Sequence, residues 1–479
     1  MKKKLLPLAL AAATGLVAST AQAVFVNPEG HGQVLLYPYY TVEGGNDTYI
    51  NLVNTTNEYK AVKVRILEAM NSQEVLDFNL YLSPQDHWSA VITADTNGAG
   101  AVIRTADTSC TVPNALAATA VGVAGPSVAF RDTTYSGDSV NGLERTREGY
   151  VEIIEMGVLT DNVTDQPGVL HNAAGLPGDC SVLTTNWQPA GKWTADETTD
   201  VDVPTGGLYG YGVIINVADG TDATYDAVAL DKFVDVVEDP LATTIHAAPG
   251  SILPSLAQAT PIAHVLDGSA AAPAVIAATP VSGLGIDAVS TVLQSSSIMN
   301  DYVLEPTING ATDWVVTFPT KKVYVNKPAP ADAPFTNVWS ATTSTACEEI
   351  GIVYYDREER SVSPDPLDFS PLPPAGAATS LCHEANIISF NNSDVLSGSS
   401  RVQTDLNVIH NNGWMEVDFT GTFNTIAREI ATDAGDFEGL PVIGFAVQKY
   451  VNGDVNGTGV LSNYAGSVTH KAKRSIIAP

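Results

Sequence analysis

The sequence predicts an all-β protein built from two tandem immunoglobulin-like antiparallel β-sandwiches with long loop insertions. Two observations carry this prediction. The stretch from Asp47 to Ile92 alternates apolar and polar residues through three segments, and a period of two places successive side chains on opposite faces of a sheet. In addition, four segments of the second half resemble segments of the first half in the same order, which indicates two related units.

The three alternating segments are separated by polar turns. They span residues 48–53, 62–66 and 76–82, and polar residues at 54–57, 71–73 and 83–86 interrupt them. Because Asn, Ser, Asp and Pro favour turns, the segments are joined by short connections. Antiparallel strands with short connections are typical of a β-sandwich.

Residues 1–23 have the organisation of a bacterial secretory signal peptide. Lysines at positions 2–4 precede an apolar run from Leu5 to Val17, and Ala21-Gln22-Ala23 fits the cleavage site. We therefore expect the mature chain to begin at Val24. The residue directly after the cleavage site is Val24 rather than a cysteine, so a lipid anchor is not indicated. No other apolar run reaches about 20 residues, so no transmembrane segment is predicted.

The chain is strongly acidic. It contains 53 Asp and Glu against 23 Lys and Arg, which gives a formal net charge of −30. A surface of this sign repels nucleic acid and anionic lipid, so we expect neither as a partner. Solubility outside the cell is the favoured interpretation of the charge, and calcium-rich surroundings are the alternative.

The first predicted sandwich covers residues 24–240. Besides the alternating stretch, we expect strands at residues 33–40, 148–156 and 208–217. Pro38 marks the first of these as an edge strand or a bulged strand, because proline cannot donate to a ladder. Polar insertions with little periodicity lie around residues 95–142 and 157–205.

Residues 241–300 are predicted to be an Ala- and Pro-rich crossing segment with little helix. Four prolines fall between residues 252 and 284. The best helix candidate of the whole chain is 286–300, although its apolar residues form no clean stripe.

The second predicted sandwich covers residues 301–479. We expect strands at 312–318, 350–358, 413–419 and 441–447, which resemble 47–53, 62–68, 149–154 and 211–217. Chance similarity among β-rich segments is the alternative interpretation.

Four cysteines follow the signal peptide, and exported proteins reach an oxidising compartment, so two disulfides are expected. Three pairings are possible. We favour Cys110–Cys180 with Cys347–Cys382, because each pair then lies within one half of the chain. A metal site is the rival interpretation, but neither CxxC nor HxH spacing supports it.

No motif predicts catalysis, and we expect a protein that is not an enzyme. The eight histidines are scattered without ligand spacing, and no G-x-S-x-G sequence is present. Asn452, Asp454 and Asn456 are calcium candidates, because they occupy positions 1, 3 and 5 of a possible loop with Gly457 at position 6. The twelfth position is Asn463 rather than Glu, and a Gly-rich hairpin turn is the favoured alternative. We expect no cofactor, and calcium with a structural role is the alternative.

Long motifs in both halves of the chain resemble an uncharacterised family of exported proteobacterial cell-surface or surface-layer-like β-rich proteins. The motifs are VLLYPYYTV, VNTT, KAVKVRILEAMNSQEVLDFNLYLSP, REGYVEIIEMG, MNDYVLEPTINGATDWVVTFPTKK and LPVIGFAVQKYVNG. The resemblance extends over nearly the whole chain and is weakest around residues 95–142, 157–205 and 240–300. It implies a location outside the cytoplasm but carries over no catalytic residues.

These observations favour a secreted structural or interaction protein of a Gram-negative cell surface, or of the periplasm, that self-assembles into a layer, filament or extracellular matrix. Its partner would be a second copy of itself, and the edge of a strand such as 33–40 would pair between copies. The alternative is an extracellular module that binds a cell-surface glycan or another ligand. The aromatic platform would then comprise Tyr37, Tyr39, Tyr40, Trp187, Trp193 and Trp339.

Overall fold

The computed structural model of the chain describes residues 23–96, 99–133, 135, 137–235, 243–268, 274–326, 333–362, 379–421 and 427–477. The fold is all-β, with mainly antiparallel sheets and a few short helices, as the sequence predicts. The predicted signal peptide lies outside the described residues, except for Ala23.

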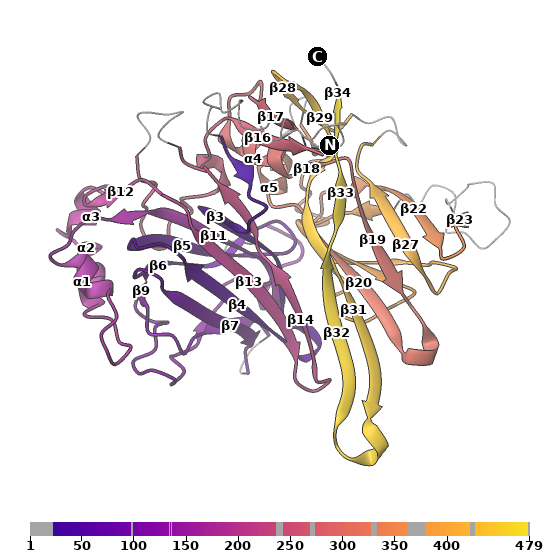
Figure 1. Cartoon of the computed structure of the whole chain (residues 1–479), viewed down its shortest axis with the longest axis horizontal. Helices are drawn as coiled ribbons and strands as arrows, with labels where there is room; N and C mark the ends of the chain where they lie inside the picture. Colours follow the sequence, from indigo (N-terminus) through magenta and orange to yellow (C-terminus); the bar gives the residue numbers. More distant parts are fainter. Residues whose placement is uncertain are drawn as a thin grey trace, which may run out of the picture.

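Two large sheets form the first sandwich, drawn in indigo to magenta in Figure 1. Sheet I has the order β1-β15-β3-β11-β5-β6-β9, with β12 beside β11. Its strands are β1 (Phe25–Val26), β3 (Val34–Thr41), β5 (Lys60–Glu68), β6 (Glu74–Leu82), β9 (Cys110–Val112), β11 (Glu148–Leu159), β12 (Val201–Asp202) and β15 (Val228–Asp231). Sheet II has the order β10-β8-β7-β4-β13-β14, with β2 beside β13. Its strands are β2 (His31–Gly32), β4 (Asn46–Asn54), β7 (His87–Ala94), β8 (Ala101–Arg104), β10 (Val128–Ala129), β13 (Leu208–Asn216) and β14 (Thr221–Asp226).

Two five-stranded sheets form the second sandwich, drawn in orange to yellow in Figure 1. Sheet III has the order β23-β22-β27-β19-β33, and sheet IV has the order β26-β25-β20-β31-β32. Their strands are β19 (Ser297–Val303), β20 (Gly310–Thr317), β22 (Gly351–Asp356), β23 (Ser361–Val362), β25 (Ala385–Phe390), β26 (Gln403–Leu406), β27 (Asn412–Asp418), β31 (Ile443–Asp454), β32 (Leu461–Thr469) and β33 (Lys471–Lys473).

Short elements complete the described structure. The small β-elements are β16 (Ala263–Asp267) with β17 (Ala274–Ala278), β18 (Gln294–Ser295) with β30 (Leu440–Pro441), β21 (Glu348–Glu349) with β24 (Ser380–Leu381), and β28 (Glu429–Thr432), β29 (Gly435–Glu438) and β34 (Ser475–Ile477). The α-helices are α1 (Asp165–Val169), α2 (Ser181–Asn186), α3 (Lys192–Ala195), α4 (Gly285–Leu293) and α5 (Lys321–Val325). The 3₁₀ turns are η1 (Glu43–Gly45), η2 (Leu143–Arg147), η3 (Leu256–Gln258), η4 (Pro306–Ile308) and η6 (Val455–Gly457).

The segments that resemble one another in sequence also pair alike. In the first sandwich β4 pairs with β13, and β5 pairs with β11. In the second, β20 pairs with β31 and β22 pairs with β27, again antiparallel. The two halves therefore share these strand pairings, while an immunoglobulin-like topology stays a prediction.

The prediction that residues 33–40 form a free edge is wrong. Strand β3 lies inside sheet I between β15 and β11 and is buried throughout. Pro38 is tolerated because β3 is bulged there: Tyr37 pairs with Val151 and Tyr40 with Gly149, so that two residues oppose one. The carbonyl of Pro38 then accepts a hydrogen bond from Thr317 of the second sandwich, at 2.6 Å.

Strand β5 is more buried than its alternation predicts. All nine of its residues are buried, because sheet I is covered on both faces. Lys63 and Arg65 point away from the sandwich interior, where Lys63 pairs with Asp77 and Arg65 with Glu74 and Glu152. The ion pairs compensate the cost of removing these cations from water.

The predicted helix at 286–300 is about half as long in the structure. Helix α4 ends at Leu293, and the chain continues as β18 and β19. Every residue of α4 except Asp287 is buried, which explains why its sequence shows no amphipathic stripe.

The two sandwiches share part of one hydrophobic core. Sheet IV directs one row of side chains toward sheet III and the other row toward the first sandwich. The second row includes Val315, Ile387 and Phe445, which join the core between sheets I and II. The insertion at 157–205 carries α1–α3, which cover the outer face of sheet I.

Both predicted disulfides are present. Cys110 of β9 is bonded to Cys180 beside α2, and Cys347 is bonded to Cys382 in the second sandwich. Within the described ranges, no helix is both long and apolar enough to cross a membrane.

Candidate functional site

Most of the aromatic residues predicted as an exposed platform are buried. Tyr37, Tyr39, Tyr40 and Trp193 have no exposed surface. The three tyrosines belong to β3 inside sheet I, and their hydroxyl groups donate to interior acceptors. These four residues therefore cannot form a glycan platform, and this part of the prediction is wrong. The three tyrosines are buried because β3 is covered on both faces.

The tryptophans of the helical insertion hold it against sheet I. The rings of Tyr81 and Trp193 stack with centroids 5.6 Å apart, and Trp187 donates to the Tyr81 hydroxyl at 2.9 Å. His246 completes the cluster, and burial lowers its pKa to about 4. It is therefore a neutral packing residue at physiological pH.

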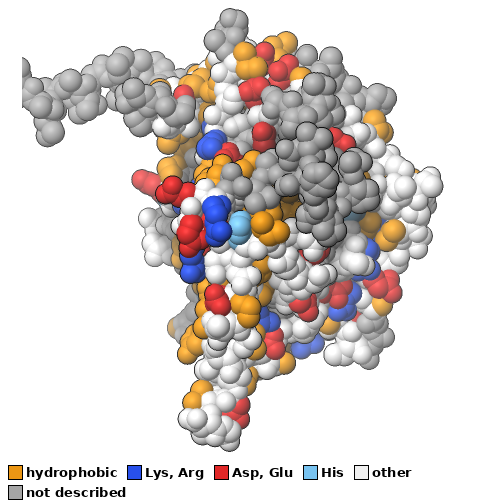
Figure 2. Space-filling view, turned by 90° about the vertical axis from the view of Figure 1, so that its right-hand side faces the viewer, with side chains coloured by type: hydrophobic (Ala, Val, Ile, Leu, Met, Phe, Trp, Pro, Cys, Tyr) orange, Lys and Arg blue, Asp and Glu red, His pale blue; other side chains and the backbone are white. Residues whose placement is uncertain are grey.

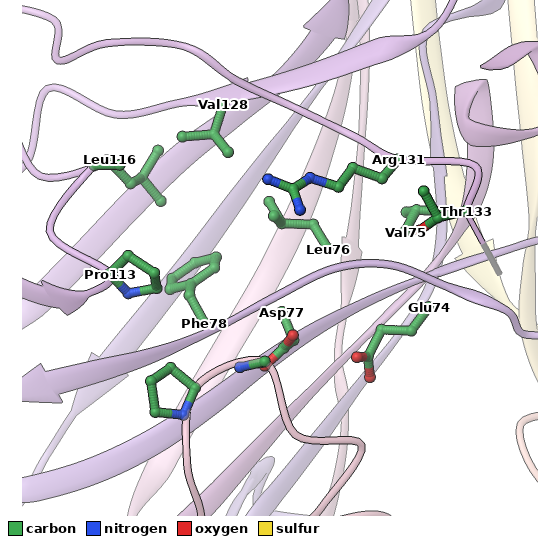
Figure 3. Close-up of a pocket in the computed structure, with 13 residues that line it drawn as sticks. Glu74, Val75, Leu76, Asp77, Phe78, Pro113, Leu116, Val128, Arg131 and Thr133 are labelled. Atoms are coloured by element: carbon green, nitrogen blue, oxygen red, sulfur yellow. The ribbon is translucent and has the colours of Figure 1, made fainter. Parts of the chain in front are cut away.

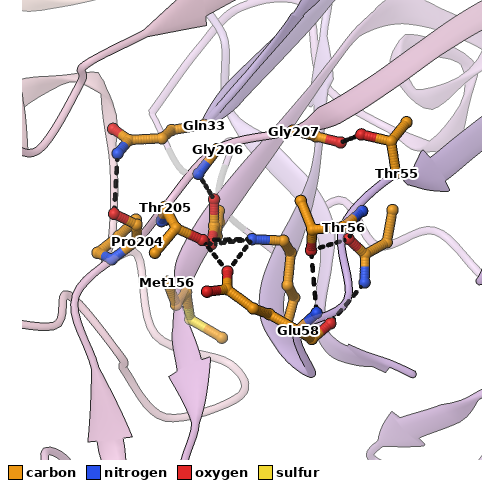
Figure 4. Close-up of polar contacts among 12 residues, drawn as sticks. Gln33, Thr55, Thr56, Glu58, Met156, Pro204, Thr205, Gly206 and Gly207 are labelled. Carbon is orange, nitrogen blue, oxygen red and sulfur yellow. Dashed lines mark hydrogen bonds and ion pairs between the residues drawn. The ribbon is translucent and has the colours of Figure 1, made fainter. Parts of the chain in front are cut away.

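A buried ion pair links β5 and β11 beneath the loop 203–207 (Figure 4). Lys60 Nζ lies 2.7 Å from Glu155 Oε1, and neither side chain is exposed. The Glu155 carboxylate also accepts the backbone N–H groups of Thr205 and Gly206, at 3.0 and 2.7 Å. Burial raises the pKa of Glu155, and Lys60 opposes that shift. These contacts give the pair a structural task, which is to fix the loop.

The calcium candidates lie at the tip of the β31–β32 hairpin. The side chain of Asn452 donates to the carbonyl of Ser462 at 3.0 Å, and Asp454 accepts the N–H of Gly459 at 2.9 Å. Asn456 has a positive φ of 53° inside η6. The structure thus has the hairpin turn here, and calcium binding at this tip stays a prediction. Among the residues described, no three His, Cys, Asp or Glu side chains are grouped so as to hold a metal ion.

This hairpin projects beyond the body of the molecule (Figures 1 and 2). Strand β20 pairs with β31 only as far as Tyr450, so residues 451–463, here called the arm, form a two-stranded ribbon. Near its base the arm is held by the carbonyl of Asp219, which accepts from Asn463 at 2.7 Å. Asp454 is the one charged residue in the arm.

Apolar side chains of the arm face solvent. Val455, Val460 and Leu461 are exposed by 40%, 61% and 44%, and Tyr464 at the base by 62%. A lone two-stranded hairpin is marginally stable in water, and clustered exposed apolar groups mark interaction sites. The sequence contains this signal, because Val and Leu flank the Gly-rich turn that was considered for calcium.

A groove of about 500 Å³ runs along the outer edge of β6 (Figure 3). This size lies within the range of binding pockets in proteins. Strand β9 pairs with β6 only at Asn79–Tyr81, so the half of β6 from Glu74 to Phe78 has no second ladder partner among the described strands. Phe78, Pro113, Leu116 and Val128 form an apolar wall at one end of the groove (Figure 3).

Charged side chains occupy the other side of the groove. Glu74 is paired with Arg65 at 2.8 Å and Asp77 with Lys63 at 3.0 Å, so each carboxylate has a cation beside it, although Glu74 shares Arg65 with Glu152. Arg131 donates its backbone N–H to Val75, while its guanidinium reaches into the groove beside Leu76 (Figure 3). The ion pairs beside the groove join Lys63 to Asp77 and Arg65 to Glu74, and among the described residues none involves that guanidinium.

In comparisons with known proteins, no family model, no curated protein and no solved structure matches the chain. The interpretation of the arm and the groove therefore rests on their own geometry.

Proposed function

We propose that this chain is an exported structural protein of the bacterial cell surface that self-associates through its projecting arm. The carrying observation is the exposure of Val455, Val460 and Leu461 on a ribbon that extends past its neighbouring strands. In a chain with a net charge of −30, close approach of two copies requires surfaces with little charge. The arm meets this requirement, because Asp454 is its one charged residue.

Export is part of the same proposal. Two disulfides and the signal-like N-terminal sequence support a location outside the cytoplasm. A layer, a filament or a matrix are the forms of assembly that this proposal covers.

The test is the molar mass of the mature, oxidised protein measured by size-exclusion chromatography with light scattering over a range of concentrations. We expect the mass to rise with concentration for the wild type and to stay at one chain for Val455→Ser/Val460→Ser. Val163→Ser is the matched control, because Val163 is 78% exposed but lies outside the arm. Adding calcium and then EDTA shows whether the ion changes the assembly. Assembly that is equal in all three proteins would exclude the arm as the contact.

A second candidate function is glycan binding by the outer face of sheet III. Trp414 of β27 is 38% exposed, and its ring stacks on that of Tyr355 of β22, with centroids 4.6 Å apart and planes at 13°. The C–H face of a sugar ring packs well against such an exposed aromatic face. The aromatic platform predicted from the sequence does not include Trp414. Met415 and Val417 are buried, and Trp414 alternates with them along β27, so its side chain lies on the opposite, outer face of the sheet.

Glycan screening with the wild type and Trp414→Ala tests this candidate. Binding that the substitution abolishes would support it, with Tyr464→Ala as a matched control for an exposed aromatic residue on the arm. If the wild-type protein binds none of the glycans tested, glycan binding by sheet III is contradicted.

A further inference from the structure

We infer that the groove along β6 is the receptor for the arm of a second copy of this chain, so that copies join head to tail. This inference rests on the proposed self-association and names the surface that the arm contacts. Three properties of the two surfaces support it.

The first property is apolar complementarity. The arm presents Val455 and Val460 at its tip, and Leu461 where β32 passes Gly220 of the β13–β14 turn. The groove is a hollow of about 500 Å³ whose apolar lining includes the partly exposed side chains of Leu76 and Val128, together with Phe78 and Leu116, which are 3% exposed. Burying these aliphatic side chains in the hollow would remove apolar surface from water on both partners, which is the main driving force of association.

The second property is charge. Arg131 is the cationic side chain that lines the groove, and no ion pair joins it to another described residue. The arm contains one charged residue, Asp454, which lies between Val451 and Val455. The acidic groups of the groove, Glu74 and Asp77, are paired with Arg65 and Lys63, so an incoming carboxylate meets an unpaired cation. Complementary charge of this kind sets orientation and register between partners.

The third property is the main chain. Among the described strands, none forms a second ladder with the edge of β6 from Glu74 to Phe78, where the carbonyl of Val75 accepts from the backbone N–H of Arg131. At the base of the arm, Val451 is hydrogen-bonded to Asn309 and Asn463 to Asp219, and beyond these residues no described strand pairs with the outer edges of the arm. Strand edges of this kind can pair with another strand. The arm belongs to sheet IV of the second sandwich and the groove to sheet I of the first, and Figure 1 shows β6 away from the arm. Contact between two different surfaces does not close on itself as a two-fold dimer does, and it generates rings or open filaments.

Mixing two defective variants tests the inference. The arm variant is Val455→Ser/Val460→Ser, which keeps its groove intact. The groove variant is Ala115→Trp, which fills the groove from an exposed position and keeps the arm intact. Ala115→Ser is its control, and circular dichroism with thermal melting confirms that each variant folds.

We expect each variant alone to have the mass of one chain, and an equimolar mixture to give a species of twice that mass, because one sound arm then meets one sound groove. Ala115→Ser should assemble as the wild type does. If the arm variant is monomeric but Ala115→Trp still assembles, the arm binds elsewhere and the inference fails while the proposed function stands. If the wild type itself does not assemble, both fail. A mixture that stays monomeric while the wild type assembles would also overturn the inference.

Discussion

The ring of Tyr225 in the first sandwich stacks on the ring of Phe445 in the second, with centroids 4.5 Å apart and planes at 12°. Tyr225 also donates its hydroxyl to the carbonyl of Tyr39 beside the bulge of β3. The contact lies in the core that both sandwiches share. The two halves are therefore bound by packing of the kind found inside a domain.

Replacing Phe445 with alanine should destabilise both sandwiches together. Deleting a buried phenylalanine costs about 3–5 kcal/mol, and Phe445 is 1% exposed. Because the core is shared, we expect calorimetry to show one unfolding transition for the wild type and one at lower temperature for Phe445→Ala. Two separate transitions, of which only one moves, would contradict a shared core.

Asp313 should make the stability of the inter-sandwich contact depend on pH. Its carboxylate accepts the N–H groups of Val395 and Leu396, at 3.0 and 2.9 Å, and these residues pack into the shared core. Burial raises the pKa of Asp313 from 3.8 to about 6. The folded state therefore holds the proton more tightly, so this contribution to stability is complete below pH 3.8 and is lost as the pH rises through about 6.

The measurement is the free energy of unfolding in urea for the wild type and Asp313→Asn at several pH values. Between pH 7 and pH 4 the wild type should gain stability relative to the variant, by at most about 3 kcal/mol. A difference between the two proteins that stays constant over this range would show that Asp313 does not titrate as described.

Removing Lys60 alone should lower the free energy of unfolding more than replacing both Lys60 and Glu155 by uncharged residues. Lys60→Met leaves the Glu155 carboxylate buried without its cation, and such a change costs about 3–5 kcal/mol. Lys60→Met/Glu155→Gln removes both charges and keeps one of the two oxygens that accept from Thr205 and Gly206, so we expect part of the loss to be recovered. Urea denaturation compares the two variants, and a double variant less stable than the single one would argue against this account.

Each disulfide should stabilise the chain by about 2–5 kcal/mol. The sequence separations are 70 for Cys110–Cys180 and 35 for Cys347–Cys382, and a doubled loop adds only about 0.6 kcal/mol in the chain-entropy model. Replacing each pair by serines and measuring urea denaturation checks this. Equal stability of the wild type with and without a reducing agent would contradict it.

The sequence predicted the strands well because β4, β6 and β20 alternate or are bounded by turn residues. It placed β3 wrongly at an edge, because Pro38 signals an edge or a bulge equally and only the neighbouring strands decide. The end of α4 was missed because a helix buried on all sides shows no stripe. Lys63 and Arg65 of β5 predicted a solvent-exposed strand face. That face is buried, because both residues pair with Asp77, Glu74 and Glu152 on other strands, and no local sequence pattern shows which strands are neighbours.

The arm and the groove differ in how far sequence predicts them. The Gly-rich turn from Gly453 to Gly459 indicates a hairpin, but its projection depends on where β20 stops pairing. The groove depends on the short reach of β9 along β6, and it unites residues 74–78, 113–116, 128–133 and 249–250. Such long-range proximity leaves no periodic signal in the chain.

Hydrogen exchange of the backbone amides, measured by mass spectrometry at low and high protein concentration, tests the central claim most directly. An unpartnered two-stranded ribbon should exchange rapidly. The account predicts that amides of residues 451–463 become protected as the concentration rises, and that those of residues 74–78 do so in parallel if the groove is the receptor. A rise in molar mass without protection of the arm, or no rise at all, would contradict self-association through the arm.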